Sequence, residues 1–203
     1  MTTFLLIRHG ETDANGKLMA GSAKGWRLNP RGTRQAQMLA DRLASVEIRA
    51  IYASPLERAM ETAEPIARSH GIQPIPVEGL GEIRIGAWQG IPFSELDRRE
   101  DWRRFNTFRS GTCPPGGELM RETQTRMFTE IESLRARHPE DTVAVVSHSD
   151  PLRSLLAFHL GIPLDLTRRL QLNTGSLSVV RMDASSVRVL SVNQMEGNPL
   201  CVF

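Results

Sequence analysis

Two apolar runs of this chain each end in a histidine, and this repeated pattern constrains the fold more than any other feature. Residues 4–7 are apolar and lead into Arg8-His9-Gly10-Glu11, and residues 143–146 are apolar and lead into Ser147-His148-Ser149-Asp150. Such runs are typical of buried parallel strands, whose carboxyl ends meet ligands at one edge of a sheet. We therefore expect His9 and His148 to converge on one ligand.

The remaining pattern predicts strands that alternate with helices. Helix starts are indicated at Asn29-Pro30, at Ser54-Pro55, where serine would cap and proline would open the helix, and at Asp150-Pro151. A longer helix is expected over 118–138. Strands are expected at residues 4–7, 50–53, 75–77 and 142–146, with a C-terminal hairpin of 177–182 and 187–192. This alternation predicts an α/β fold with a mainly parallel sheet and helices on both faces.

The domain organisation follows from length and from the absence of linkers. The chain has 203 residues, with no internal repeat and no stretch rich in Pro, Gly and Ser that would divide it. We therefore expect a single domain over 1–203. Residues 78–118 read as an irregular excursion with a short helix near 93–99. Long excursions of this kind are usually functional, and we expect a lid or a side wall.

Composition excludes several classes of function. The net charge of +2 and the low aromatic content of 5% argue against nucleic-acid binding. No apolar run approaches the roughly 20 residues that span a bilayer, and no signal peptide opens the chain, so we expect a cytoplasmic protein without membrane contact. Cys113 and Cys201 are too few for a disulfide framework or a zinc site.

The residues at the first strand end suggest phosphate chemistry. An imidazole such as that of His9 is a competent nucleophile toward phosphorus. The guanidinium of Arg8 can hold two phosphate oxygens at once, and Gly10 lets the backbone turn beside a ligand. Arg58 falls near the start of the predicted second helix, where the helix dipole also favours anions. Together with His148, these residues predict a cradle for a phosphate dianion.

Phosphoryl transfer also needs a proton donor for the leaving oxygen, and Glu82 is the best candidate. It lies in the glycine-rich segment 79–90, where nothing in the local pattern requires a carboxyl group. A carboxyl group beside an anionic phosphate has a raised pKa, which suits an acid that works near neutral pH.

Four blocks of the sequence resemble the histidine phosphatase superfamily, also called the phosphoglycerate mutase-like family. They occur in the expected order from Leu5 to His148, and weaker similarity continues over residues 173–178. The blocks are Arg8-His9-Gly10-Glu11-Thr12 with Asn15; Ser54-Pro55-Leu56 with Arg58 and Thr62-Ala63; Glu82 with Gly86 and Trp88; and Val146-Ser147-His148.

The resemblance implies a role for each matching residue. His9 would become phosphohistidine, and Glu82 would protonate the leaving group and then help to activate water. Phosphoryl oxygens would be held by Arg8, Arg58 and His148, and Asn15 would line the pocket. It also implies a three-layer α/β/α sandwich, chemistry without a metal or other cofactor, and a small phosphate ester as substrate. Dimers are frequent in the family, which leaves a homodimer open.

The chain departs from the family pattern at two places. The residue after the second histidine is often glycine in the family, and here it is Ser149. The loop of residues 16–22 is about one residue shorter than the commonest form, so no phosphate contact is carried over to Gly21 or Ser22. The stretch Gly116-Gly117-Glu118 fits a frequent family loop without an assigned role.

We expect a phosphomonoesterase acting on small phosphorylated metabolites, and three alternatives remain. A cofactor-dependent phosphoglycerate mutase shares the catalytic set, but mutases carry extra segments before the second histidine, and the 66 positions from Glu82 to His148 are compact. A metallohydrolase could use His9 with Glu11 and His148 with Asp150. A binding module without catalysis could use the same fold. The arginines near residue 100 are predicted to form a solvated face, with recognition of an acidic substrate group as the less favoured alternative: Arg98, Arg99, Arg103 and Arg104.

Overall fold

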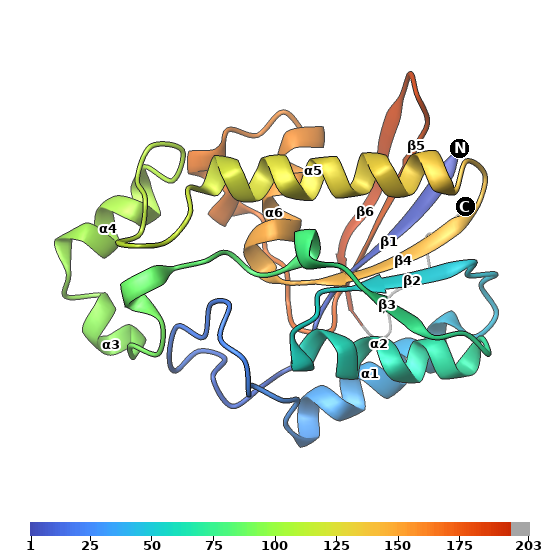
Figure 1. Cartoon of the computed structure of the whole chain (residues 1–203), viewed down its shortest axis with the longest axis horizontal. Helices are drawn as coiled ribbons and strands as arrows, with labels where there is room; N and C mark the ends of the chain where they lie inside the picture. Colours follow the sequence, from blue (N-terminus) through green and yellow to red (C-terminus); the bar gives the residue numbers. More distant parts are fainter. Residues whose placement is uncertain (196–203) are drawn as a thin grey trace.

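A computed structural model describes residues 1–195 and contains one mixed sheet in the order β3-β2-β4-β1-β5-β6 (Figure 1). Strands β3, β2, β4 and β1 run parallel, whereas β5 and β6 are antiparallel to their neighbours. The sheet is thus mainly parallel, as the sequence predicts. The strands are β1 (Thr2–Arg8), β2 (Ala50–Ala53), β3 (Pro74–Pro76), β4 (Thr142–Ser147), β5 (Leu177–Met182) and β6 (Val187–Gln194).

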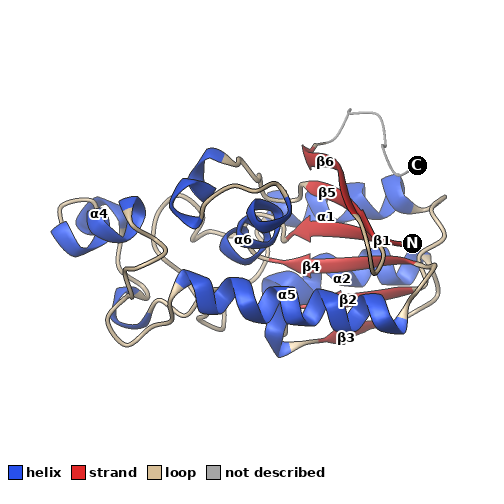
Figure 2. Cartoon of the chain, turned by 90° about the horizontal axis from the view of Figure 1, so that it is seen from above, coloured by secondary structure: helices blue, strands red, loops and turns tan. Residues whose placement is uncertain are grey.

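Helices cover both faces of this sheet, which gives the expected three layers. Helices α1 and α2 pack against one face, and α5 and α6 pack against the other (Figures 1 and 2). Two shorter helices, α3 and α4, lie outside the sandwich. The helices are α1 (Pro30–Leu43), α2 (Glu57–Ser69), α3 (Phe93–Leu96), α4 (Glu100–Thr107), α5 (Met120–Arg137) and α6 (Ser149–His159).

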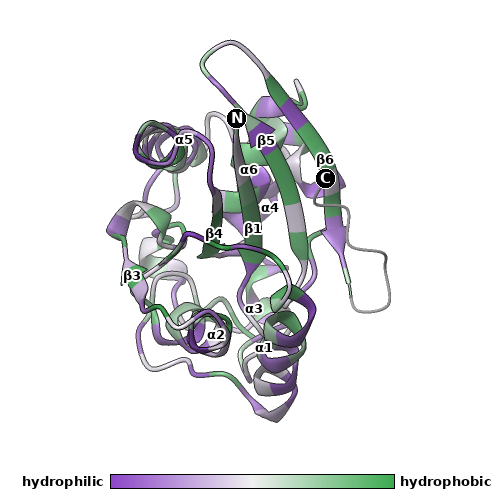
Figure 3. Ribbon diagram, turned by 90° about the vertical axis from the view of Figure 1, so that its right-hand side faces the viewer, coloured by the Kyte–Doolittle hydropathy of each residue, from purple (hydrophilic) through white to green (hydrophobic). Residues whose placement is uncertain are grey.

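The central strand β1 contributes side chains to both cores because successive residues of a strand point to opposite faces. Leu5 and Ile7 belong to the core under α1 and α2, whereas Phe4 and Leu6 belong to the core under α5 and α6. All four are essentially inaccessible to solvent. Figure 3 shows the hydrophobic residues gathered along these central strands. A strand buried on both faces reads as a continuous apolar run, and this explains why its polar end stands out.

Residues 78–118 include the short helix expected near 93–99, as α3, but they are more ordered than the sequence suggested. They contain two helices and build a third hydrophobic core around the fully buried Trp88. The Trp88 ring packs edge-on against Trp102, with ring centroids 5.3 Å apart, and at 5.3 Å against Phe105. Aromatic contacts of this kind order a segment too short for a conventional core. The segment lies beyond the carboxyl ends of the parallel strands (Figure 2).

The predicted start of the second helix is wrong. Helix α2 begins at Glu57, after Leu56, and Ser54 does not cap it. The Ser54 hydroxyl instead contacts His148, so tertiary structure takes over the side chain that local pattern assigned to the helix. The third strand is also displaced, to Pro74–Pro76. By contrast, β2 has the predicted bounds, and α1 begins at Pro30 with Asn29 accepting from the Gly32 amide.

Within the described residues, no helix is long and apolar enough to cross a bilayer. Cys113 is an exposed free thiol, and Cys201 lies outside the described residues.

Candidate active site

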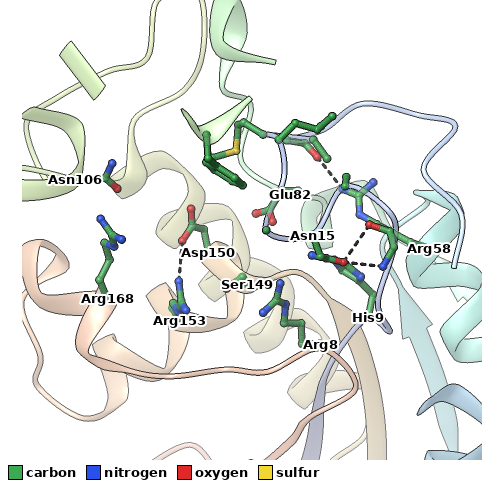
Figure 4. A pocket seen from close by; sticks show the side chains of 18 of the residues that line it. Arg8, His9, Asn15, Arg58, Glu82, Asn106, Ser149, Asp150, Arg153 and Arg168 are labelled. Atoms are coloured by element: carbon green, nitrogen blue, oxygen red, sulfur yellow. Dashed lines mark hydrogen bonds and ion pairs between the residues drawn. The ribbon is translucent and has the colours of Figure 1, made fainter. Parts of the chain in front are cut away.

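A cavity of about 270 Å³ opens at the carboxyl ends of β1 and β4 (Figure 4). Five of the six residues singled out from the sequence line it: Arg8, His9, Asn15, Arg58 and Glu82. The sixth, His148, is fully buried next to His9, with ring centroids 5.0 Å apart. The structure therefore brings together the side chains that the strand-end argument placed at one sheet edge.

The His9 ring is oriented by its own backbone. Its Nδ1 lies 2.7 Å from the Gly10 carbonyl oxygen, and a carbonyl can only accept, so Nδ1 carries the proton. The lone pair is then on Nε2, the atom on the opposite side of the ring. Burial and the charges of Arg8 and Arg58 hold the pKa of His9 well below its usual value. The imidazole is thus neutral near pH 7, as a nucleophile must be.

Gly10 is required for a reason other than a sharp turn. A Cβ at Gly10 would lie 2.6 Å from the Gly32 carbonyl oxygen, because the first turn of α1 packs directly on this backbone. The Gly10 amide donates to the Thr62 hydroxyl at 3.0 Å, and that hydroxyl donates to the Arg58 carbonyl at 2.7 Å. Helices α1 and α2 therefore hold the residue that follows His9 from two sides.

The Ser54 hydroxyl orients the His148 ring. It lies 2.7 Å from His148 Nε2 and accepts from the Leu56 amide at 3.4 Å. With that amide as its donor, the hydroxyl is free to donate to Nε2, and the imidazole proton then lies on Nδ1. His148 Nδ1 is buried and has no partner among the described residues. Burial, followed by the charge of Arg58, lowers the pKa of His148 well below its usual value.

The two expected arginines are anchored by backbone carbonyls. Arg8 donates from Nη1 to Leu172 at 2.6 Å, and its buried Nε has no partner among the described residues. Arg58 donates from Nη2 to Gly21 at 2.7 Å and from Nη1 to Ala23 at 3.2 Å. Burial lowers the pKa of Arg8 to about 10, so it stays charged near neutral pH. Neutral carbonyl partners position both guanidinium groups without cancelling their charge.

Asn15 and Glu82 line the same cavity, and different hydrogen bonds hold their side chains. The Asn15 Oδ1 accepts from the Thr12 amide at 2.7 Å and from its hydroxyl at 3.0 Å, which leaves the Asn15 NH₂ group for a ligand. Glu82 forms no ion pair within the described residues, and its Oε1 accepts from the Ile83 amide at 3.0 Å. Burial, and then the negative charge of Asp150, raise the pKa of Glu82 to about 7.

The cavity also contains polar side chains beyond the predicted six. Arg109 is 3% exposed and donates to both carboxylate oxygens of Asp150, at 2.8 and 3.0 Å. Arg153 donates from Nε to the Leu170 carbonyl at 2.9 Å. Further lining residues are Asn106, Ser149 and Arg168. These residues come from α4, the start of α6 and the 3₁₀ turn Leu164–Arg169.

Comparison with known proteins identifies the family of this chain. The model of the histidine phosphatase superfamily (branch 1) matches residues 4–195. The chain belongs to this superfamily. Among curated proteins, it is 31% identical over 198 residues to phosphoserine phosphatase 1 of Hydrogenobacter thermophilus, covering 95% of this chain and 92% of that protein.

Solved structures agree with this family assignment. Bacillus stearothermophilus YhfR superposes with a TM-score of 0.88 at 30% identity, and the match covers 100% of both chains. The phosphoserine phosphatase of Entamoeba histolytica, solved in complex with 3-phosphoglyceric acid, superposes with a TM-score of 0.85 at 26% identity, covering 97% of this chain and 98% of that one. The α/β fold is thus that of known histidine phosphatases.

The metallohydrolase alternative does not fit the contacts of Glu11 and Asp150. Both carboxylate oxygens of Glu11 are engaged elsewhere, because one accepts from Asn29 at 3.1 Å and the other pairs with Arg31 at 3.2 Å. Asp150 is occupied by Arg109. Within residues 1–195, no group of three His, Cys, Asp or Glu is arranged to hold a metal ion.

Arg153 and Arg109 were not selected as site residues because the sequence around them marks them only weakly or not at all. Arg153 follows the second histidine by five positions, which places it on the first turns of the helix that begins there. Arg109 lies beyond the end of α4, and no local pattern marks it. The four arginines at 98, 99, 103 and 104 are exposed, as predicted.

Proposed function

We propose that this chain is a phosphomonoesterase that hydrolyses small phosphate esters through a phosphohistidine on His9. One observation carries the proposal: the buried, neutral imidazole of His9 lies in a cavity that two anchored guanidinium groups also line. Its Nε2 has no hydrogen-bond partner among the described residues, so the lone pair is available to attack. Family membership supports phosphatase activity, and relatives named phosphoserine phosphatase are similar over nearly the whole chain.

In the first step, His9 Nε2 attacks phosphorus and the bond from phosphorus to the ester oxygen breaks. Glu82 donates its proton to that leaving oxygen, and a pKa of about 7 keeps the proton available near neutral pH. Arg8 and Arg58 neutralise the equatorial oxygens, where charge is spread in the transition state. His148 donates from Nδ1 to one of these oxygens, and Asn15 donates from its amide.

In the second step, water attacks the phosphohistidine and the phosphorus–nitrogen bond breaks. The Glu82 carboxylate accepts the proton of that water, so the acid of the first step becomes the base of the second. His9 Nε2 recovers its lone pair, and inorganic phosphate leaves. The hydrogen bond from His9 Nδ1 to the Gly10 carbonyl supports the charge that the phosphorylated ring carries.

The size of the cavity favours a small substrate. About 270 Å³ lies below the range of roughly 300–1,000 Å³ typical of pockets for drug-sized ligands. In this proposal the chain works as a single domain, and residues 78–118 form a side wall of the site. Phe93, Trp102 and Asn106 of that segment already line the cavity.

The experiment combines turnover with trapping of the intermediate. His9→Ala abolishes turnover of p-nitrophenyl phosphate and the acid-labile ³²P label that the native enzyme retains after quenching. His159→Gln, a half-buried histidine remote from the cavity, keeps both. Thermal unfolding of each variant shows that it is folded. A folded His9→Ala protein with native turnover rules out the mechanism.

Glu82→Gln tests the acid. It slows alkyl phosphates about 10²- to 10⁴-fold, and p-nitrophenyl phosphate much less, because nitrophenolate leaves without a proton. Glu78→Gln, an exposed carboxylate just before this loop, is the control. Equal losses on both classes of ester contradict the acid role. Product analysis with phosphoglycerates separates hydrolysis, which releases phosphate, from a mutase, which returns an isomer.

A further inference from the structure

The side of the cavity opposite His9 carries positive charge that the hydrolytic steps do not use. Arg153 and Arg168 lie across the cavity from His9 and Arg58, with Asp150 and Ser149 nearby (Figure 4). None of the proposed bond-breaking steps reaches these two guanidinium groups. They are nevertheless part of the same cavity, so a ligand bound at His9 extends toward them.

Protein partners do not saturate these two arginines. Both carboxylate oxygens of Asp150 accept from Arg109, and the nearest Arg153 nitrogen, Nη1, is 3.8 Å from Asp150 Oδ1. Arg153 is held in place by its Nε, which donates to Leu170. Its Nη2 has no hydrogen-bond partner among the described residues. Arg168 is exposed, lines the cavity, and forms no hydrogen bond and no ion pair within residues 1–195.

Arg153 and Arg168 line the same cavity, so their positive charges oppose each other. Burial lowers the pKa of Arg153, and the charge of Arg168 contributes to that lowering. Arg153 likewise contributes to the lowered pKa of Arg8, whose main cause is burial. Arginines therefore line the cavity from the phosphate end to the opposite wall. An anion between Arg153 and Arg168 would relieve this repulsion.

The balance of charges in the cavity indicates how much negative charge the ligand carries. Five arginines line the cavity, namely Arg8, Arg58, Arg109, Arg153 and Arg168, and they face two carboxylates, Glu82 and Asp150. With Asp150 ionised and Glu82 protonated, as the first step requires, four positive charges remain. A phosphate dianion at His9 balances two of them, and the two that remain favour a second anionic group on the ligand. Asp150 is already bidentate with Arg109, so this wall does not offer a free carboxylate to a ligand ammonium.

We propose that Arg153 and Arg168 bind a carboxylate of the substrate, so that the enzyme prefers phosphate monoesters of small hydroxy acids. This inference rests on the proposed function, since it names the ester that the phosphatase cleaves. A guanidinium pair suits the planar carboxylate, which accepts two parallel hydrogen bonds. The small cavity fits a ligand whose phosphate and carboxylate are separated by only a few bonds.

The experiment compares two esters that differ at one group. 3-Phosphoglycerate carries a carboxylate where glycerol 1-phosphate carries a hydroxymethyl group. The ratio of their kcat/KM values cancels any general loss of activity. We expect the native enzyme to favour 3-phosphoglycerate at least about tenfold, the scale of one charge-assisted pair. Arg168→Met lowers that ratio about tenfold. Arg169→Met, an equally exposed neighbour that does not line the cavity, leaves it unchanged.

Failure of this inference is distinguishable from failure of the proposed function. Equal kcat/KM values for the two esters in the native enzyme, or a native ratio in Arg168→Met, overturn the carboxylate subsite while hydrolysis stands. Absence of p-nitrophenyl phosphate turnover overturns the proposed function instead. Calorimetric binding of both esters to His9→Ala then tests the same preference without catalysis, and equal affinities contradict the subsite.

Discussion

Arg126 donates to the main-chain carbonyl of Glu82, at 3.2 Å, and not to its carboxylate. The other end of the same guanidinium donates to the carbonyls of Gly79 and Gly81, each at 2.8 Å. Arg126 therefore fixes the backbone that carries Glu82 while leaving the carboxylate without an ion pair. The acid is held in position, and its pKa stays raised because no cation binds it directly.

Glu118 completes this clamp and gives the stretch Gly116-Gly117-Glu118 a structural role. It is 1% exposed, and its Oε1 accepts from Arg126 at 2.8 Å, from the Thr123 hydroxyl at 2.9 Å and from the Arg84 amide at 3.1 Å. The backbone is thus bound on both sides of Glu82. Such fixation keeps a catalytic group within the narrow range of productive geometry.

Arg126→Met is expected to lower kcat for alkyl phosphates about 10- to 100-fold, because a misplaced acid protonates the leaving oxygen poorly. Turnover of p-nitrophenyl phosphate falls less. Arg126→Lys recovers part of the loss, since an ammonium can contact the carbonyls without reproducing the guanidinium geometry. Arg121→Met, an exposed arginine on the same helix, is the control. An equal loss on both classes of ester would assign Arg126 a purely structural role.

Ser54→Ala is expected to lower kcat about 10- to 100-fold with little change in KM. Without the Ser54 hydroxyl, the His148 proton is no longer confined to Nδ1, and the donor to the phosphoryl oxygen is lost for part of the time. Removing such a donor outright costs about 10²- to 10³-fold. Nitrogen NMR shifts of the His148 ring report the tautomer directly. Ser154→Ala, a buried serine on α6 that donates to the Pro151 carbonyl, serves as the matched control.

Sequence pattern was sufficient for those parts of the molecule that repeat a general rule. The apolar runs before His9 and His148 predicted two buried parallel strands, and parallel strands share one carboxyl edge. That rule alone placed the two histidines together. Ser54 shows where local pattern fails, because its partner, His148, is 94 positions away. A serine before a proline predicts a helix start, whichever distant group forms a hydrogen bond with the hydroxyl.

The third hydrophobic core and the contact between Arg109 and Asp150 could not be predicted, for a related reason. Trp88, Trp102 and Phe105 are spaced irregularly, so they show neither helical nor strand periodicity, yet they meet as a cluster. Arg109 and Asp150 are 41 positions apart, and their contact exists only after the segment 78–118 folds over the sheet edge. Contacts of this kind depend on tertiary structure and leave no local sequence signal.

The value of kcat/KM for an alkyl phosphate should fall as the pH rises through about 7. Glu82 must be protonated in the first step, and its pKa is raised to about 7 by burial and by Asp150. His9 does not limit activity on the acid side, because its pKa is well below its usual value. In the Glu82→Gln variant, this decrease of kcat/KM at alkaline pH disappears. Asp150→Asn moves it to lower pH, since one cause of the raised pKa is gone; a shift to higher pH contradicts the assignment.

Loss of the buried ion pair between Arg109 and Asp150 should destabilise the fold. Arg109→Met leaves Asp150 without its partner, at a cost of about 3–5 kcal/mol in the free energy of unfolding, measured by urea denaturation. Arg109→Met combined with Asp150→Leu recovers much of that loss, because no charge is then left unpaired. Arg104→Met, an exposed neighbour, is the control.

The pH dependence of this stability has a defined sign. Burial opposes ionisation of Asp150, but the pair with Arg109 outweighs it and lowers the folded-state pKa below the ordinary value of about 3.9. The stabilisation is therefore complete above that ordinary value and is lost as pH falls toward the folded-state pKa. The difference in unfolding free energy between the native protein and the double variant should accordingly shrink below about pH 4. A difference that stays constant from pH 7 to pH 3 would show that the pair contributes no pH-dependent stability.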